Sequence, residues 1–256
     1  RLVAASNAQT NTINIDDGDI SVIGILNGAA AVDLVITVAD SAANGTVTVT
    51  GDVLATTGNI TITASSDGTL FDFQGNFTES GEVGRINLDG AQLATTADVA
   101  QFSGTSKNID AIIEGVGAAD GTISLTGSTE FDDTVGASNA IGLITVATGK
   151  SGDFNAAVDS VAVTTVGTGE LTFSAALGVD TLTNSGTVNI QSTTTNVAAG
   201  NETAVIMNLT GSVLNFNGAS ASAQDVIITA ATTGFGTINV FDGTDDAAGG
   251  TTTLAA

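Results

Sequence analysis

Alternating apolar and polar residues recur along the whole chain, and most of these runs follow a glycine. The clearest copies are NGTVTVTG at 44–51, DGTLFDFQG at 67–75, DGTISLTG at 120–127, SGTVNIQS at 185–192 and FGTINVF at 235–241. Alternation over four to six residues is typical of a β-strand with one buried face. The glycine before each run is expected to supply a turn with positive φ. The chain is therefore predicted to be all-β.

The spacing of the copies indicates a regular repeat. In the second half of the chain the leading glycines are Gly121, Gly142, Gly169, Gly186, Gly211 and Gly236. Their average step is about 23 residues, and periods of ~20–50 residues are those of stacked repeat architectures. A second apolar stretch lies between consecutive copies, such as VAVTT at 161–165 and VDTLT at 179–183. The unit therefore consists of two strands and two turns.

Two architectures fit this repeat. We favour a parallel β-solenoid (β-helix) with ~23-residue turns, about eleven coils stacked ~4.8 Å apart, because helix-length periodic segments and tight hairpin pairs are both scarce. Tandem antiparallel β-sandwich domains are the alternative. Residues 1–256 are expected to form one elongated solenoid, with an inserted loop or a boundary near 91–120, where ATTADVAQF at 94–102 has the composition of a short helix.

Composition excludes several classes of partner. The chain has 27 acidic and four basic residues and a net charge of −23, a balance that repels phosphate backbones and anionic lipid. We therefore expect no nucleic-acid partner, and no apolar segment is long enough for membrane insertion. The ten Phe, with no Trp and a 42% apolar content, suit a thin core of repeated side chains.

Catalysis is not expected. The chain has no His and no Cys, so the usual base and thiol nucleophile are missing. Asp132 and Asp133 form the one adjacent carboxylate pair that merits comparison with a sugar hydrolase, but no Trp or Tyr offers an aromatic platform for a sugar ring. We predict a protein that is not an enzyme.

Calcium is the one cofactor that the sequence suggests. Two acidic turns surround glycines, and Ca²⁺ prefers several oxygen ligands from flexible acidic turns. Neither turn matches a known calcium-loop pattern, and solvated acidic turns are common without metal. The candidate ligands are Asp16, Asp17 and Asp19 in the first turn and Asp242, Asp245 and Asp246 in the second.

The stretch VDSVAVTTVGTGELTFSAALGVDTLTNSGTVNIQS at 158–192 resembles the passenger regions of bacterial autotransporter adhesins and related β-helical surface-layer proteins. The likeness lies in the GTVNI-type strand and in the A-L-G and N-S-G turns, and it extends loosely over 121–256. It implies secretion, a cell-surface location and a role in adhesion or coat formation. The chain ends without the strands of a membrane barrel, so we expect either that a barrel was removed or that this is a free subunit.

Self-association is expected on physical grounds as well. Natural proteins protect open strand edges with Pro, Lys or a covering element, whereas this chain has no Pro and few Lys. Solenoid ends without such protection are expected to stack end to end or exchange a strand, and TNTINIDDGDISVIGIL at 10–26 is the candidate donor. The alternative is that flanking residues outside this sequence supply a cap. The expected function is an extracellular structural protein, a self-assembling subunit of a cell-surface layer or filament. The alternative is an adhesin passenger domain that binds a host or surface ligand, and a polysaccharide-active β-helix is a third option.

Overall fold

The computed structural model describes the central part of the chain continuously and the rest as separate segments. The described ranges are 2–3, 9–15, 19–27, 33–40, 45–56, 58–64, 68–80, 83–89, 98–191, 203–207, 212–216, 226–230, 236–240 and 252–255. Structural statements below refer to these residues.

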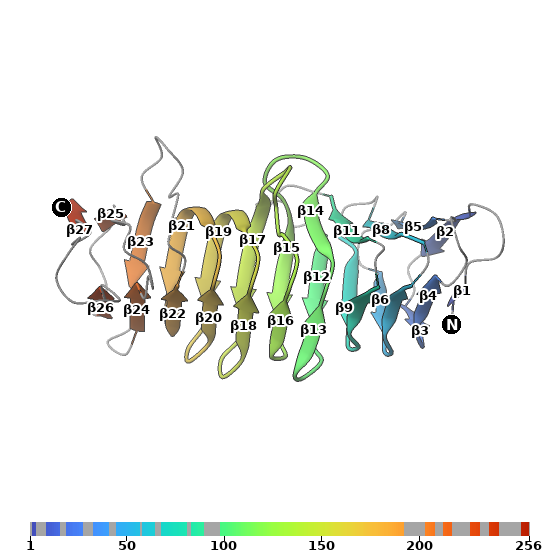
Figure 1. Ribbon diagram of the computed structural model, residues 1–256, viewed down its shortest axis with the longest axis horizontal. Helices are drawn as coiled ribbons and strands as arrows, with labels where there is room; N and C mark the ends of the chain where they lie inside the picture. The colour runs from blue at the N-terminus through green and yellow to red at the C-terminus, as the bar shows by residue number, and fades with distance from the viewer. Residues whose placement is uncertain are drawn as a thin grey trace.

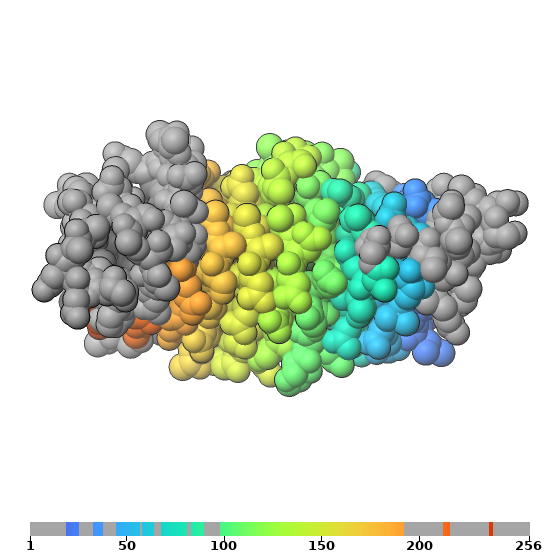
Figure 2. All heavy atoms as spheres, viewed as in Figure 1, coloured from blue at the N-terminus to red at the C-terminus, as the bar shows by residue number. Residues whose placement is uncertain are grey.

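The chain is a parallel β-solenoid, as the repeat predicts. Every strand pairing among the described residues is parallel, and each strand pairs with the equivalent strand of the next coil rather than with its neighbour in sequence. The coils follow one another along the long axis of the molecule (Figure 1), and in the space-filling view they form successive bands in chain order (Figure 2). The antiparallel sandwich alternative is therefore wrong.

Two long sheets and one short sheet form the sides of the coil. The first long sheet contains, in spatial order, β1 (Leu2–Val3), β4 (Ile25–Asn27), β7 (Val53–Ala55), β10 (Phe77–Glu79), β13 (Lys107–Ile109), β16 (Thr129–Phe131), β18 (Ser151–Phe154), β20 (Glu170–Phe173), β22 (Thr187–Ile190), β24 (Ser212–Phe216) and β26 (Gly236–Val240). The second long sheet contains β3 (Asp19–Val22), β6 (Thr46–Val49), β9 (Leu70–Phe73), β12 (Val99–Phe102), β15 (Asp120–Leu125), β17 (Ile141–Val146), β19 (Val158–Thr165), β21 (Leu177–Asn184), β23 (Thr203–Met207), β25 (Val226–Ala230) and β27 (Thr252–Ala255). The short sheet contains β2 (Gln9–Ile15), β5 (Leu34–Asp40), β8 (Ile60–Ala64), β11 (Gly84–Leu88) and β14 (Ile112–Gly115).

The coil changes from three strands to two near the middle of the molecule. After β14, the third side continues only as isolated bridges from Ile113 to Val135 and from Val135 to Val158. Val158 already belongs to β19, an eight-residue strand that covers the third side and the second long sheet together. The coils become shorter accordingly: Ile60 pairs with Gly84 before the change, whereas Val158 pairs with the nearer Leu177 after it.

The core is a narrow apolar column inside the coil. Residues alternate inward and outward along the strands, so Thr122, Ser124 and their equivalents face outward while Ile123 and Leu125 are buried. Six buried phenylalanines form a continuous series of ring contacts: Phe71, Phe73, Phe102, Phe131, Phe154 and Phe173. The first two share β9, the contact between Phe102 and Phe131 joins the two long sheets edge to face, and the other three contacts join register partners on successive coils. Because equivalent positions in parallel coils lie ~4.8 Å apart, identical rings are brought to stacking distance.

Glycine has two separate roles in the turns. The positive φ expected before the strands occurs at Gly68 and Gly121, but most of the other described glycines that precede strands have ordinary φ. The glycine at the end of each repeat is needed because the backbones of two coils approach each other closely there. A Cβ on Gly127 would clash with the carbonyl oxygen of Gly104 on the neighbouring coil, and a Cβ on Gly75 would clash with the carbonyl oxygen of Gly51. Stacked coils are closest at this corner, so a side chain has no room there.

The segment near 91–120 contains strands of the same sheets. β12 lies between β9 and β15, and β13 lies between β10 and β16. The short helix expected at 94–102 is wrong for its last part, which forms β12, because these residues alternate inward and outward in the sheet; residues 91–97 lie outside the described residues. Among the described residues there is no helix of the length and apolarity that crossing a membrane would require.

Candidate functional site

Three acidic side chains from three consecutive coils gather at one corner of the solenoid. Glu79 ends β10, Asp110 directly follows β13, and Asp133 lies just beyond β16. These strands are neighbours in the first long sheet, with Phe77 paired to Ile109 and Ile109 to Phe131. Parallel stacking therefore places the three acidic residues above one another, although they are far apart in sequence.

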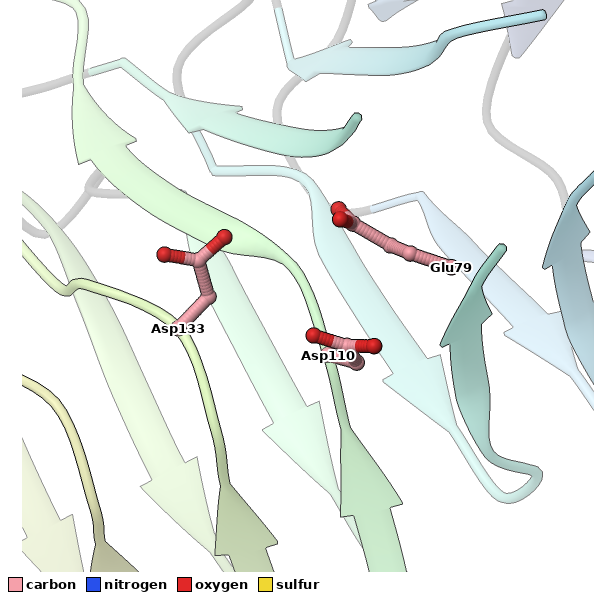
Figure 3. A group of neighbouring side chains, drawn as sticks. All are labelled: Glu79, Asp110 and Asp133. Carbon is pink, nitrogen blue, oxygen red and sulfur yellow. The ribbon is translucent and has the colours of Figure 1, made fainter. Parts of the chain in front are cut away.

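The carboxylates of this acidic corner are close together. One oxygen from each of Glu79, Asp110 and Asp133 lies within 4.8 Å of the other two, and all three side chains are partly buried. Figure 3 shows the three groups extending into one region from separate coils. Backbone amides hold two of them: Glu79 Oε1 accepts a hydrogen bond from the Gly84 N–H, and Asp133 Oδ1 accepts one of 2.6 Å from the Thr134 N–H.

The ionisation of Glu79 is displaced toward the protonated form. Burial, together with the charges of Asp110 and Asp133, raises the pKa of Glu79 from 4.5 to about 7, although the hydrogen bond from Gly84 opposes the change. Desolvation is the largest cause because it disfavours the charged carboxylate. Among the described residues, no ion pair places a basic side chain on Glu79 to offset the cost of its desolvation. Arg85, which follows Gly84, pairs with Glu114 at 2.8 Å instead.

This arrangement can do two things chemically. Near neutral pH it can hold a proton on Glu79, which relieves repulsion among the three carboxylates. It can also offer three oxygens to a divalent cation. Hard cations such as Ca²⁺ and Mg²⁺ prefer carboxylate oxygens, and these three lie within 4.8 Å of one another.

Of the acidic residues expected to bind calcium, the structure describes only Asp19. Asp19 is exposed at the start of β3. It does not belong to the acidic corner of Glu79, Asp110 and Asp133. The remaining candidates lie outside the described residues: Asp16, Asp17, Asp242, Asp245 and Asp246.

Asp132 and Asp133 both follow the end of β16 but have different neighbours. Asp132 is exposed and accepts hydrogen bonds from the side-chain amides of Asn108 at 2.6 Å and Asn155 at 2.7 Å. Asp133 joins the acidic corner instead. The two carboxylates thus have different surroundings, Asp132 in an amide ladder on the sheet face and Asp133 at the corner.

Sequence reasoning identified Asp133 but missed Glu79 and Asp110. A signal can be recognised once the register is known, because Glu79 and Asp133 stand at the same spacing after an inward phenylalanine, Phe77 and Phe131 respectively. Asp110 directly follows the equivalent Ile109, so the position shifts between coils and no fixed spacing marks it. The acidic corner could be found only from the strand register.

No family model matches the chain, and comparison with curated proteins and with solved structures gave no match either.

Proposed function

We propose that this chain is an extracellular structural protein that assembles end to end, through its coil edges, into a cell-surface layer or filament. The observation that carries the proposal is the one-sided pairing of β3, which bonds to β6 on one side and ends the second long sheet on the other. Within the described residues, the N–H and C=O groups on the outer edge of β3 are arranged like those through which one interior coil pairs in parallel with the next.

Within the described part of the chain, the outer edge of β3 can be assigned to particular backbone groups. The Thr50 N–H donates to the Val22 carbonyl at 2.9 Å, so Val22 directs its backbone groups toward β6. Backbone groups alternate in direction along a strand, and Ser21 therefore directs its N–H and C=O away from β6. A second copy of this chain can pair there in parallel, as each coil already pairs with the next.

Surface charge and resemblance support the same reading. A net charge of −23 keeps such a rod soluble and limits sideways association. The resemblance of 158–192 to autotransporter passengers and β-helical surface-layer proteins fits an external, non-catalytic role. The segment at 10–26, expected as an exchange donor, contributes β2 to a pairing with β5 and β3 to a pairing with β6 within the chain, so edge stacking is the simpler route.

Electron microscopy and light scattering of the purified chain test this proposal. The wild type is expected to form ordered polymers, and Ser21→Pro is expected to shorten or abolish them, because proline removes the outward N–H while leaving the bonds to β6 in place. Ser21→Ala keeps the N–H and is the matched control. A wild type that stays monomeric, or a Ser21→Pro variant that polymerises as well as Ser21→Ala, would refute the proposal.

The same preparation tests the calcium expectation. Polymers that dissociate on addition of a chelator, and reform with calcium chloride, would give the acidic turns a role in assembly. The rival function, an adhesin passenger that binds a surface ligand, would be favoured instead by a chain that stays monomeric and holds to cells.

A further inference from the structure

The outward face of the second long sheet is uncharged over β15, β17, β19 and β21, which lie side by side in the middle of the molecule (Figure 1). Its outward side chains form two columns in register across these strands. One column is made of hydroxyl residues: Ser124, Thr145, Thr164 and Thr183. The other contains Thr122, Leu143, Ala162 and Thr181. All of these residues are partly exposed, and together they are called the neutral face.

The other sides of the same coils are acidic. On the first long sheet Glu130, Asp153 and Glu170 are exposed on β16, β18 and β20. Toward the third side, Asp159 and Asp180 are exposed in the first halves of β19 and β21. Two copies that met through these sides would bring like charges together, which is unfavourable. Within residues 98–191, the neutral face is therefore the side on which a second copy can approach without that repulsion.

The side chains of the neutral face suit packing against an identical face. Two sheets pack about 10 Å apart when their side chains interdigitate, and residues no larger than leucine allow this approach. A hydroxyl both donates and accepts a hydrogen bond, so the hydroxyl column of one copy can bond to that of another. The apolar side chains of Leu143 and Ala162 would leave water in the same contact, which favours association.

The size of the neutral face determines when such a contact is stable. With ~4.8 Å between coils and ~3.4 Å per residue, it measures about 19 Å by about 14 Å, or roughly 270 Å². Stable interfaces bury about 800 Å² on each partner, so one pair of chains is held weakly. A polymer repeats the contact once per chain, and linked weak contacts add up to a much tighter association.

We propose that the neutral face joins two polymers of this chain side by side, so that the assembled form is a pair of rods. The inference rests on the proposed end-to-end assembly, because only a polymer repeats the contact often enough. Once two rods have paired, the sides that remain outward in this region are the acidic ones, which repel a third rod. The pairing is therefore expected to stop at two and to favour a filament over a layer.

Cysteine cross-linking of the purified chain tests the contact, since the chain has no cysteine of its own. Thr164→Cys places a thiol on the neutral face. Thr187→Cys is the matched control, because Thr187 is also a partly exposed, outward residue but lies on the first long sheet beside the exposed Glu170. With diamide as oxidant, Thr164→Cys is expected to form disulfide-linked dimers at least about fivefold faster, the ratio given by about 1 kcal/mol of preferred contact. Equal rates would overturn the proposal and leave the neutral face to a partner of another kind.

Electron micrographs of the polymers give a second readout. Wild-type polymers are expected to be two rods wide, and Thr164→Glu, which places a charge on the neutral face, is expected to give single rods of unchanged length. Thr187→Glu adds the same charge to the acidic side and should leave the rods paired. Wild-type polymers one rod wide would overturn the pairing and leave end-to-end assembly intact. The absence of any polymer would instead refute end-to-end assembly, and the cross-linking rates would then decide whether the neutral face associates.

Discussion

Replacing Glu79 by glutamine is expected to stabilise the protein in a pH-dependent way. The pKa of Glu79 is raised in the folded state from 4.5 to about 7 by burial and by Asp110 and Asp133. Below about pH 4.5 this carboxyl is protonated in both folded and unfolded chains, and its ionisation contributes nothing to stability. Between about pH 4.5 and pH 7 the unfolded chain releases the proton while the folded chain retains it, so the free energy of unfolding falls as the pH rises.

The magnitude follows from the displacement of the pKa. A rise from 4.5 to about 7 corresponds to about 3.4 kcal/mol at about 1.36 kcal/mol for each pH unit. Glu79 is only partly buried, so solvent screening reduces this figure, and about 1–2 kcal/mol is the expected destabilisation above pH 7. Glutamine has no charge to desolvate and can still accept the hydrogen bond from the Gly84 N–H. Glu79→Gln should therefore exceed the wild type in stability by about 1–2 kcal/mol at about pH 8 and match it at about pH 4.

Urea unfolding followed by circular dichroism, at several pH values between those limits, measures the difference. Glu130→Gln removes one negative charge from the exposed face of β16, outside the acidic corner, and controls for the change in net charge. If the gain from Glu79→Gln were the same at both ends of the pH range, or no larger than that from Glu130→Gln at high pH, the account of the acidic corner would be wrong.

Two further predictions concern the packing of the coils. Phe131→Ala should lower the free energy of unfolding by about 3–5 kcal/mol, because the ring is 1% exposed and its centroid lies 5.1 Å and 4.6 Å from those of Phe102 and Phe154. Phe131→Leu refills most of the cavity and should lose less than half as much in the same urea titration; equal losses would show that the buried volume does not set the cost. Gly127→Ala should lower the melting temperature measured by calorimetry by more than about 5 °C, since its Cβ would clash with the Gly104 carbonyl oxygen; an unchanged melting temperature would mean that the coils can separate at this corner without loss.

The local pattern of the sequence was sufficient to predict the strands and their parallel stacking. DGTISLTG contains a turn glycine, an inward Ile123 and Leu125, and outward Thr122 and Ser124, and the structure places each of these as the alternation predicts. A two-residue period depends only on neighbouring residues, so it can be read without knowing the rest of the fold. The longer repeat then implied that equivalent strands lie side by side, which the pairings confirm.

The contacts between coils were decided by the tertiary structure alone. Loop lengths vary from coil to coil, so the partner of Phe77 on the next coil is the distant Ile109, whereas the partner of Leu171 is the much nearer Val188. A fixed period therefore cannot tell which residues of different coils meet. The acidic corner depends on those unequal steps, and so does the change from three strands per coil to two. Each requires residues from separate coils to share one place, and only the folded coil specifies which of them do.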